Sequence, residues 1–196
     1  MATWFTADPH FSHSNILHLG PGRPFGSIEE HDEALMQAWN SRVAPGDEVW
    51  LLGDVSMKTT AAAGVIGLLN GRVHLVAGNH DACWTNHPDP RRARKAQRLV
   101  GQYLDWGFAS VHSSGIVTGV RVAGIPVVLS HLPALGDRFE GDRYASQRPR
   151  PGALPLVHGH VHHLWRVRER QVNVGVDVWG YAPVHEDELE QVLRGL

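Results

Sequence analysis

The sequence contains five short apolar runs that each give way abruptly to Asp, Asn or His. The junctions are Asp8 to His10, Gly53-Asp54, Gly78 to Asp81, Ser130-His131 and His158 to His160. Short apolar runs bounded by Gly and polar residues are typical of buried strands. Because ligands of open α/β sheets bind where the strands end at their carboxyl side, we expect the polar groups of all five junctions to lie on one rim of the fold.

The segments between these junctions predict the class of fold. In the first half, strands are expected at 3–6, 48–52 and 72–76, and helices at 28–43, 59–69 and 91–104. Ser27 and Glu30 form a capping-box pattern that predicts where the first of these helices begins. The second half is mostly strand-like, at 108–111, 116–122, 125–129, 156–157, 165–167 and 172–176, before a last helix at 186–193. This order predicts one α/β domain, residues 1–196, in which two β-sheets pack face to face with helices outside.

Composition limits the partners that the chain can have. With 196 residues, 42% hydrophobic and 19% charged, the chain is long enough for one sizeable core and is typical of a soluble globular protein. The formal net charge of −2 gives no global basic field for long nucleic acid. Arginine is dense at 90–98 and again at 138–150, and each run is either a phosphate-attracting surface or simply a solvated face.

The sequence carries no sign of an oxidising or membrane environment. Cys83 is the single cysteine, so no intrachain disulfide can form. The sequence has no apolar run of the roughly 20 residues that a membrane span needs, and no secretory signal pattern. We therefore expect a cytoplasmic protein without a membrane partner, and we predict no particular oligomeric state.

The polar groups of the expected rim are suited to metal ions. Seven side chains are candidate ligands: Asp8, His10, Asp54, Asn79, His131, His158 and His160. Mixed nitrogen and oxygen ligands suit Mn, Fe, Zn or Co better than Ca or Mg. Seven ligands are too many for one tetrahedral ion but suit two ions if a carboxylate bridges them. For each residue taken alone, the alternative is ordinary turn chemistry, because Asp and Asn are common in turns and helix caps.

The order of these blocks identifies a family resemblance. The patterns D-x-H, G-D, G-N-H-D, H and G-H-x-H follow one another between residues 8 and 160, and this order resembles that of the calcineurin-like metallophosphoesterases. The resemblance implies a four-layer αββα sandwich and two divalent metal ions. It also implies that Asp8, His10 and His160 bind one ion. Asn79, His131 and His158 would bind the other, with Asp54 as the bridge. Among the possible ions we expect Mn first, with Fe, Zn, Co or Ni as alternatives.

The resemblance also implies the catalytic groups. His80 would lie over the phosphoryl group and either stabilise its charge or protonate the leaving oxygen. Asp81 would orient His80 by a hydrogen bond. Hydroxide held between the two ions would attack phosphorus in line.

The substrate follows from a narrower resemblance. The stretches FTADPHFSHSNI, GRPF, GVDVW and YAPV are similar to those of a small bacterial and phage subgroup that leans toward phosphodiesters. We therefore predict small phosphodiesters or nucleotides as substrates, such as 2′,3′-cyclic nucleotides or RNA ends. One alternative is a nuclease acting on longer RNA or DNA, which the arginine-rich runs favour and the net charge disfavours. The other is a non-catalytic scaffold that kept the fold.

Two further residues are candidate substrate contacts. His13 either reaches substrate from the first loop or bonds to backbone. Arg23 either binds a phosphate in the bidentate manner of arginine or forms a surface ion pair. His112, His162, His163 and His185 are interpreted as structural.

Overall fold

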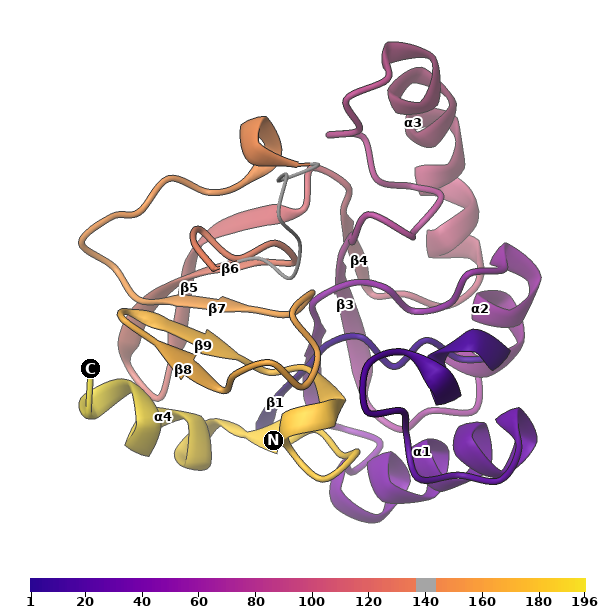
Figure 1. The fold of residues 1–196 in the computed structure, drawn as a ribbon, viewed down its shortest axis with the longest axis horizontal. Coiled ribbons are helices and arrows are strands. Elements are labelled where there is room, and N and C mark those ends of the chain that lie inside the picture. The colour runs from indigo at the N-terminus through magenta and orange to yellow at the C-terminus, as the bar shows by residue number, and fades with distance from the viewer. Residues whose placement is uncertain (137–143) are drawn as a thin grey trace.

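The computed structural model describes residues 1–136 and 144–196. Arg138 and Arg143, in the second arginine-rich run, therefore lie outside the described residues. The described chain forms two five-stranded sheets that pack face to face (Figure 1). This confirms the α/β sandwich of two packed sheets flanked by helices.

The first sheet has the strand order β10-β1-β2-β3-β4. Its strands are β1 (Thr3–Thr6), β2 (Glu48–Leu51), β3 (Arg72–Val76), β4 (Ser110–His112) and β10 (Val184–His185). Strands β1 to β4 are parallel, and β10 pairs with β1 in the antiparallel direction. The parallel pairing places the carboxyl ends of β1, β2 and β3 side by side.

The second sheet has the strand order β5-β6-β7-β9-β8. Its strands are β5 (Ile116–Val122), β6 (Ile125–Ser130), β7 (Leu156–His158), β8 (Val167–Arg168) and β9 (Gln171–Asn173). Strands β6, β7 and β9 are parallel, whereas β5 and β8 pair as antiparallel edges. The carboxyl ends of β6 and β7 therefore also share one rim.

The helices cover the first sheet and close one end of the sandwich. They are α1 (Ile28–Arg42), α2 (Thr59–Ile66), α3 (Pro90–Asp105) and α4 (Glu186–Arg194), with short 3-10 turns η1 (Ser14–His18), η2 (Ala145–Gln147) and η3 (Val176–Val178). The predicted capping box starts α1, since the Glu30 amide donates to Ser27 Oγ at 3.1 Å and the Gly26 amide donates to Glu30 Oε2 at 2.7 Å. Helix α4 packs against β1, β5 and β10. None of the helices in the described part of the chain combines the length and apolar character needed to cross a bilayer.

Alternation along the central strands builds two cores. In β2, Val49 and Leu51 point toward the helices and pack with Leu35 and Trp39 of α1. Trp50 points the other way, into the core between the sheets. Both faces of the first sheet are therefore covered, and ligands can reach its parallel strands only at the rim.

Candidate metal centre

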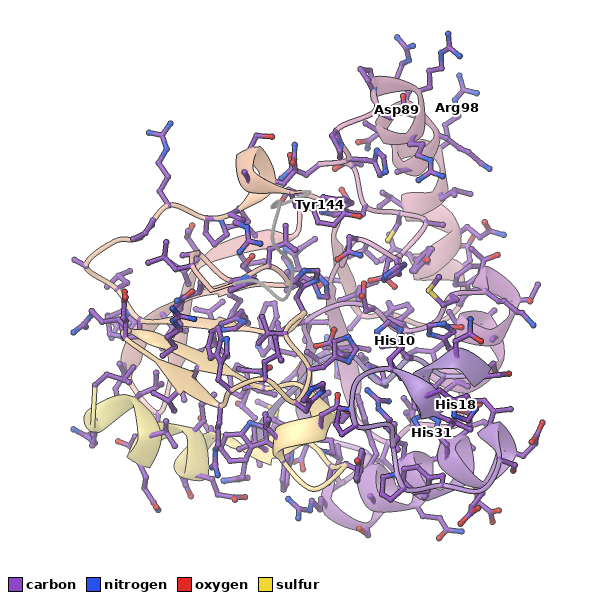
Figure 2. All side chains as sticks on the ribbon, viewed as in Figure 1. His10, His18, His31, Asp89, Arg98 and Tyr144 are labelled. Carbon is purple, nitrogen blue, oxygen red and sulfur yellow. The ribbon has the colours of Figure 1, made fainter. Side chains whose placement is uncertain are left out.

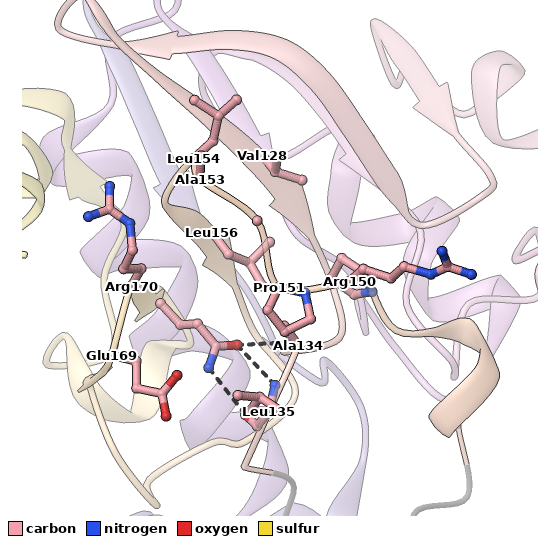
Figure 3. A pocket seen from close by; sticks show the side chains of 13 residues that line it. Val128, Ala134, Leu135, Arg150, Pro151, Ala153, Leu154, Leu156, Glu169 and Arg170 are labelled. Carbon is pink, nitrogen blue, oxygen red and sulfur yellow. Dashed lines mark hydrogen bonds between the residues drawn. The ribbon is translucent and has the colours of Figure 1, made fainter.

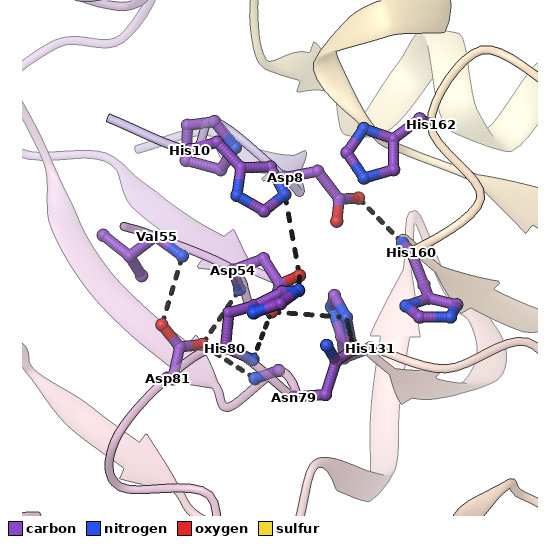
Figure 4. A network of polar contacts seen from close by, with 12 residues as sticks. Asp8, His10, Asp54, Val55, Asn79, His80, Asp81, His131, His160 and His162 are labelled. Carbon is purple, nitrogen blue, oxygen red and sulfur yellow. Dashed lines mark hydrogen bonds and ion pairs between the residues drawn. The ribbon is translucent and has the colours of Figure 1, made fainter. Parts of the chain in front are cut away.

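Two groups of possible metal ligands lie at the shared rim (Figure 4). One group is Asp8, His10 and His162, and the other is Asp54, His131 and His160. Within each group, one ligand atom from every residue lies within 4.8 Å of the others. Residues from the ends of both sheets thus converge, as the junction pattern predicted, and each buried group could hold a metal ion.

Asp54 belongs to the second group and also faces His10 of the first. Its Oδ1 is 3.5 Å from Nε2 of His131, and its Oδ2 is 3.6 Å from Nε2 of His10. The same Oδ2 is 3.9 Å from Nε2 of His80. A carboxylate whose two oxygens face different groups has the placement that a bridging ligand needs.

The backbone is unusual at the candidate ligands. Five of them have a left-handed φ: Asp8 (57°), His10 (52°), Asp54 (55°), His160 (70°) and His162 (51°). Non-glycine residues rarely adopt this conformation, and it costs of order 1–3 kcal/mol each unless the surroundings impose it. Its concentration in the two groups points to a functional site. Gly53, with φ 85°, precedes Asp54 and must be glycine, because a Cβ there would meet the Gly78 nitrogen at 2.5 Å.

Several buried ligand atoms lack a hydrogen-bond partner among the described residues. They include Asp8 Oδ1, both ring nitrogens of His10 and Nε2 of His158. Buried polar atoms are normally hydrogen-bonded, so such a concentration needs an explanation. A divalent cation would satisfy Asp8 Oδ1 and one ring nitrogen of His10, and carboxylate with imidazole is a suitable donor set for a transition metal.

Asn79 and His131 give a second sign that the site suits a cation. His131 Nδ1 lies 2.8 Å from the Leu52 carbonyl oxygen, which can only accept, so the ring proton is assigned to Nδ1. In the neutral ring, Nε2 then presents a lone pair to the Asn79 side-chain oxygen, only 3.0 Å away. Two facing lone pairs repel each other, and a cation bound to both would remove the repulsion. Asn79 therefore fits the Asp54 group as an additional ligand.

Burial dominates the electrostatics of the site. It raises the pKa of Asp8 to about 8 and lowers the pKa of His10 well below its usual value. Burial also acts to raise the pKa of Asp54, but the imidazoles of His131, His80 and His10 outweigh it and hold that pKa below its usual range. The negative charge on Asp8 is costly in this environment, and a bound cation would stabilise it.

The structure places His160 and His162 in the two groups and leaves His158 outside both. His158 Nδ1 donates to the Gly159 carbonyl oxygen at 2.7 Å, and its ring packs on Trp165 with centroids 4.8 Å apart. Burial lowers its pKa to about 3. His162, which we interpreted as structural, lies with Asp8 and His10 in place of His160. The signal was present, because the pattern G-H-x-H is matched by Gly159-His160-Val161-His162, whereas His158-Gly159-His160 reads H-G-H.

The role expected for Asp81 is corrected by its contacts. Its carboxylate accepts from the backbone amides of Asp54 at 2.9 Å, Val55 at 3.1 Å and Gly78 at 2.7 Å. Within the described residues it makes no hydrogen bond to the His80 ring. Asp81 therefore fastens the loops that carry Asp54 and Asn79, while the His80 ring, 36% exposed, lies at the mouth of the site. Burial raises the pKa of Asp81 to about 7.

Arg23 is neither a phosphate ligand nor a surface residue. It is 4% exposed, and all five of its N–H groups have partners inside the protein. Nε and Nη2 donate to Asp177 at 3.0 and 2.9 Å, and Nη2 also donates to the Asp8 carbonyl at 2.7 Å. Nη1 contacts the Pro9 carbonyl and His31 Nε2, both at 2.8 Å. The residue thus positions the loop that carries Asp8 and His10.

His13 and Asp177 lie next to residues of the Asp8 group. His13 lies beside His10, with ring centroids 5.3 Å apart, and belongs to neither group. Its Nδ1 is buried without a hydrogen bond among the described residues, so it stays a candidate substrate contact. Asp177, which the sequence did not single out, has Oδ2 3.4 Å from His162 Nδ1 and links that ring to Arg23. Such carboxylate partners commonly orient metal-binding imidazoles.

A separate cavity of about 330 Å³ lies on the second sheet (Figure 3). Its walls are mainly apolar, with Val128, Leu135, Leu154 and Leu156 among them, and they contain none of the candidate ligands. The cavity therefore contributes nothing to the metal centre.

Fold and site together define the class: an α/β sandwich with buried Asp and His groups that could hold metal. No family model matches the sequence. The Gene 66 protein of Mycobacterium phage L5 is 36% identical over 205 residues, covering 98% of this chain and 94% of the phage protein. The Gene 66 protein of Mycobacterium phage D29 is 33% identical, and the match covers 98% of this chain and 96% of that phage protein. The chain therefore belongs to the family of the mycobacteriophage Gene 66 proteins.

A solved structure supports the fold independently. The crystal structure of AQ665, a protein of unknown function from Aquifex aeolicus, superimposes with a TM-score of 0.69. The superposition covers 97% of this chain and 98% of AQ665, at 22% identity. At that identity, the likeness shows a common fold and nothing about activity.

Proposed function

We propose that the chain is a metal-dependent phosphodiesterase of the calcineurin-like type. The observation that carries the proposal is the pair of buried ligand groups with the Asp54 carboxylate between them. The ordered motif blocks from residue 8 to residue 162 support the same class.

The proposal assigns two divalent ions, Mn first, with Fe, Zn, Co or Ni as alternatives. Asp8, His10 and His162 would hold one ion. Asn79, His131 and His160 would hold the other, and Asp54 would serve as a ligand beside them. When bound, the ions would supply hydroxide at neutral pH and neutralise the phosphate oxygens.

The chain's own residues position the metal ligands and the substrate, and they supply a proton to the leaving oxygen. His80, at the mouth of the site, donates a proton or hydrogen bond to the leaving oxygen, as histidine commonly does. Arg23 and Asp177 hold the first loop and the His162 ring in place. His13 contacts the substrate beside His10.

Small phosphodiesters, such as 2′,3′-cyclic nucleotides or RNA ends, are the proposed substrates. A nuclease acting on longer strands is the second candidate, favoured by the exposed cations Arg92 and Lys95 of α3, which line a cleft together with Asn79 and His80. A non-catalytic scaffold would be expected to lose ligands or His80, and this chain retains them.

The test is hydrolysis of bis-p-nitrophenyl phosphate and p-nitrophenyl phosphate by metal-free protein reconstituted with each of the proposed ions. We expect the diester to be hydrolysed faster. Asp54→Asn should lower kcat/KM by about a thousandfold or more, the upper end for losing one electrostatic group. Glu33→Gln, on the exposed face of α1, is the matched control and should behave like wild type. Normal activity of Asp54→Asn, or no hydrolysis by wild type with any ion, would overturn the proposal.

A further inference from the structure

A cleft of about 210 Å³ opens directly beside the candidate metal centre. One wall is formed by Asn79, His80 and Asp81, which belong to the site already described. The opposite wall is helix α3, which contributes Arg92 and Lys95. We call this space the basic cleft. A substrate whose phosphate lies at the metal centre would extend into it.

Helix α3 is strongly cationic on its exposed surface. Its five basic residues are Arg91, Arg92, Arg94, Lys95 and Arg98, and no acidic residue occurs between Pro90 and Leu104. All five are exposed, and the end of the helix near Asp89 and Arg98 projects away from the sheets (Figure 2). The cleft-lining residues Arg92, Lys95, Ala96 and Leu99 recur at helical spacing, so they share one face.

The two cations of the basic cleft are not neutralised by the described part of the protein. Elsewhere, Arg72 and Arg194 form ion pairs with Glu48 and Glu190. Within residues 1–136 and 144–196, neither Arg92 nor Lys95 has such a pair. As far as the described residues are concerned, their charges are therefore available to a ligand.

His87 adds a third donor to the same cleft. Its Nδ1 accepts a hydrogen bond from the Asp89 amide at 2.9 Å, so the proton of the neutral ring is assigned to Nε2. Nη1 of Arg92 lies 3.2 Å from this Nε2. Both atoms are then donors, and they cannot satisfy each other. Two neighbouring donors of this kind suit one anionic oxygen, such as a phosphate oxygen.

Resting on the proposed function, we propose that the basic cleft binds a second phosphate group of the substrate. The preferred substrate is then a nucleotide chain that carries a phosphate next to the one being hydrolysed. A cyclic mononucleotide has a single phosphate, which must lie at the metal centre and would leave Arg92, Lys95 and His87 without a partner. The cleft therefore favours the ends of nucleic-acid strands over cyclic mononucleotides.

The first test compares the dinucleotide TpT, which has one phosphate, with the trinucleotide TpTpT, which has two. The readout is the ratio of kcat/KM per scissile bond within each protein. We expect a ratio of about ten or more in wild type and about one in the Arg92→Ala/Lys95→Ala double variant, because one lost charge-assisted contact is worth roughly tenfold. The matched control is Arg91→Ala/Arg98→Ala, which removes the same charge from residues outside the cleft and should keep the wild-type ratio.

The second test measures binding without turnover. Calorimetry on the Asp54→Asn protein would compare thymidine 3′,5′-bisphosphate with thymidine 5′-monophosphate. We expect the cleft double variant to lose about tenfold in affinity for the bisphosphate, and the control pair to lose less than twofold.

The outcomes separate the two proposals. If wild type hydrolyses no diester but bisphosphate binding depends on Arg92 and Lys95, the proposed function fails and the phosphate site stands. If diesters are hydrolysed without preference for TpTpT, the site is overturned and the function stands. The phosphate site is likewise overturned, and the function stands, if the preference for TpTpT survives in the Arg92→Ala/Lys95→Ala variant. This is also the conclusion if both double variants lose the preference equally.

Discussion

Arg23 illustrates how a residue can serve a metal centre without touching it. Its guanidinium binds the carbonyls of Asp8 and Pro9 and the carboxylate of Asp177 at the same time. A lysine could not replace it, because a single ammonium cannot present a planar fork of five donors. The loop of the first ligands and the turn that orients His162 are thereby held at a fixed spacing.

His162 and His158 offer a direct test at the residue scale. His162 belongs to the Asp8 group, whereas the His158 ring donates to Gly159 and packs on Trp165. We expect His162→Ala to lower the stoichiometry of bound Mn from two to one, or its affinity by at least about tenfold, as measured by calorimetry. Even the loss of a residue that only orients a ligand typically costs 10- to 100-fold.

His158→Ala is the comparison variant. It should keep the metal stoichiometry while losing stability, since it removes a fully buried ring. A His158→Ala protein that binds one ion, beside a His162→Ala protein that binds two, would restore the ligand set first expected.

The reason sequence analysis missed His162 is geometric. Strand β7 ends at His158, and the chain then turns through left-handed residues at His160 and His162. The strand period cannot be extended through such a turn, so periodicity does not say which imidazoles face the candidate metal site, although the G-H-x-H spacing at 159–162 does. Asp8, His10, Asp54 and His131 were brought together as expected because each lies at most four residues beyond the end of a parallel strand. Nothing in the sequence around Arg23 distinguishes a buried arginine with several hydrogen-bond partners from an arginine at the surface.

At the scale of elements, Asp47 fastens the start of the first sheet. Its carboxylate accepts hydrogen bonds from the Ala2 amide at 2.8 Å, the Trp4 indole at 3.0 Å and the Ala44 amide at 3.1 Å. It thus joins β1 to the loop that leads from α1 into β2. These hydrogen bonds lower the pKa of Asp47 to about 2, and the bond from the Ala2 amide has the largest effect.

The depressed pKa predicts how stability depends on pH. The carboxylate form stabilises the fold above the ordinary aspartate pKa of about 3.9, and this contribution is lost as pH falls through about 2. We expect Asp47→Asn to be less stable than wild type at pH 7, with the difference shrinking between pH 4 and pH 2. Urea unfolding at a series of pH values measures this. An undiminished difference at pH 2 would contradict the assignment.

Most elements could be predicted because their patterns are local. The bounds of β1, β3 and β5 agree with those expected, and α1 begins at its capping box. Strand β10 was missed. It has two residues, Val184 and His185, and exists because these pair with Phe5 and Trp4 at the other end of the sequence. A strand so short has no period to detect, and only the tertiary contact creates it.

At the scale of the whole molecule, the candidate metal centre joins both sheets. The Asp8 group draws on β1 and on the loop after β7, so an ion bound there cross-links distant parts of the chain. Ligands that bind only the native state stabilise it by mass action. Metal occupancy should therefore be visible as resistance to heat.

We expect Mn at a hundredfold excess over its dissociation constant to stabilise the protein by about 2.7 kcal/mol. For a domain of this size, that corresponds to a rise in Tm of roughly 5–10 °C over chelator-treated protein. Scanning calorimetry of wild type, Asp54→Asn and Glu33→Gln measures the effect. The Asp54 variant should show little of the rise and the Glu33 variant all of it. Equal shifts in all three would mean that the ion stabilises the protein from somewhere else.

The position of β1 between β2 and β10 has a consequence for biosynthesis. A ribosome makes Trp4 at the outset but His185, its pairing partner, only some 180 residues later. Until then, one edge of the first sheet stays unpaired and exposed to neighbouring chains. His162 and Asp177 are also synthesised late. A nascent or truncated chain should thus accumulate as an incomplete and aggregation-prone sheet, and the candidate metal site should be complete only when translation is nearly over.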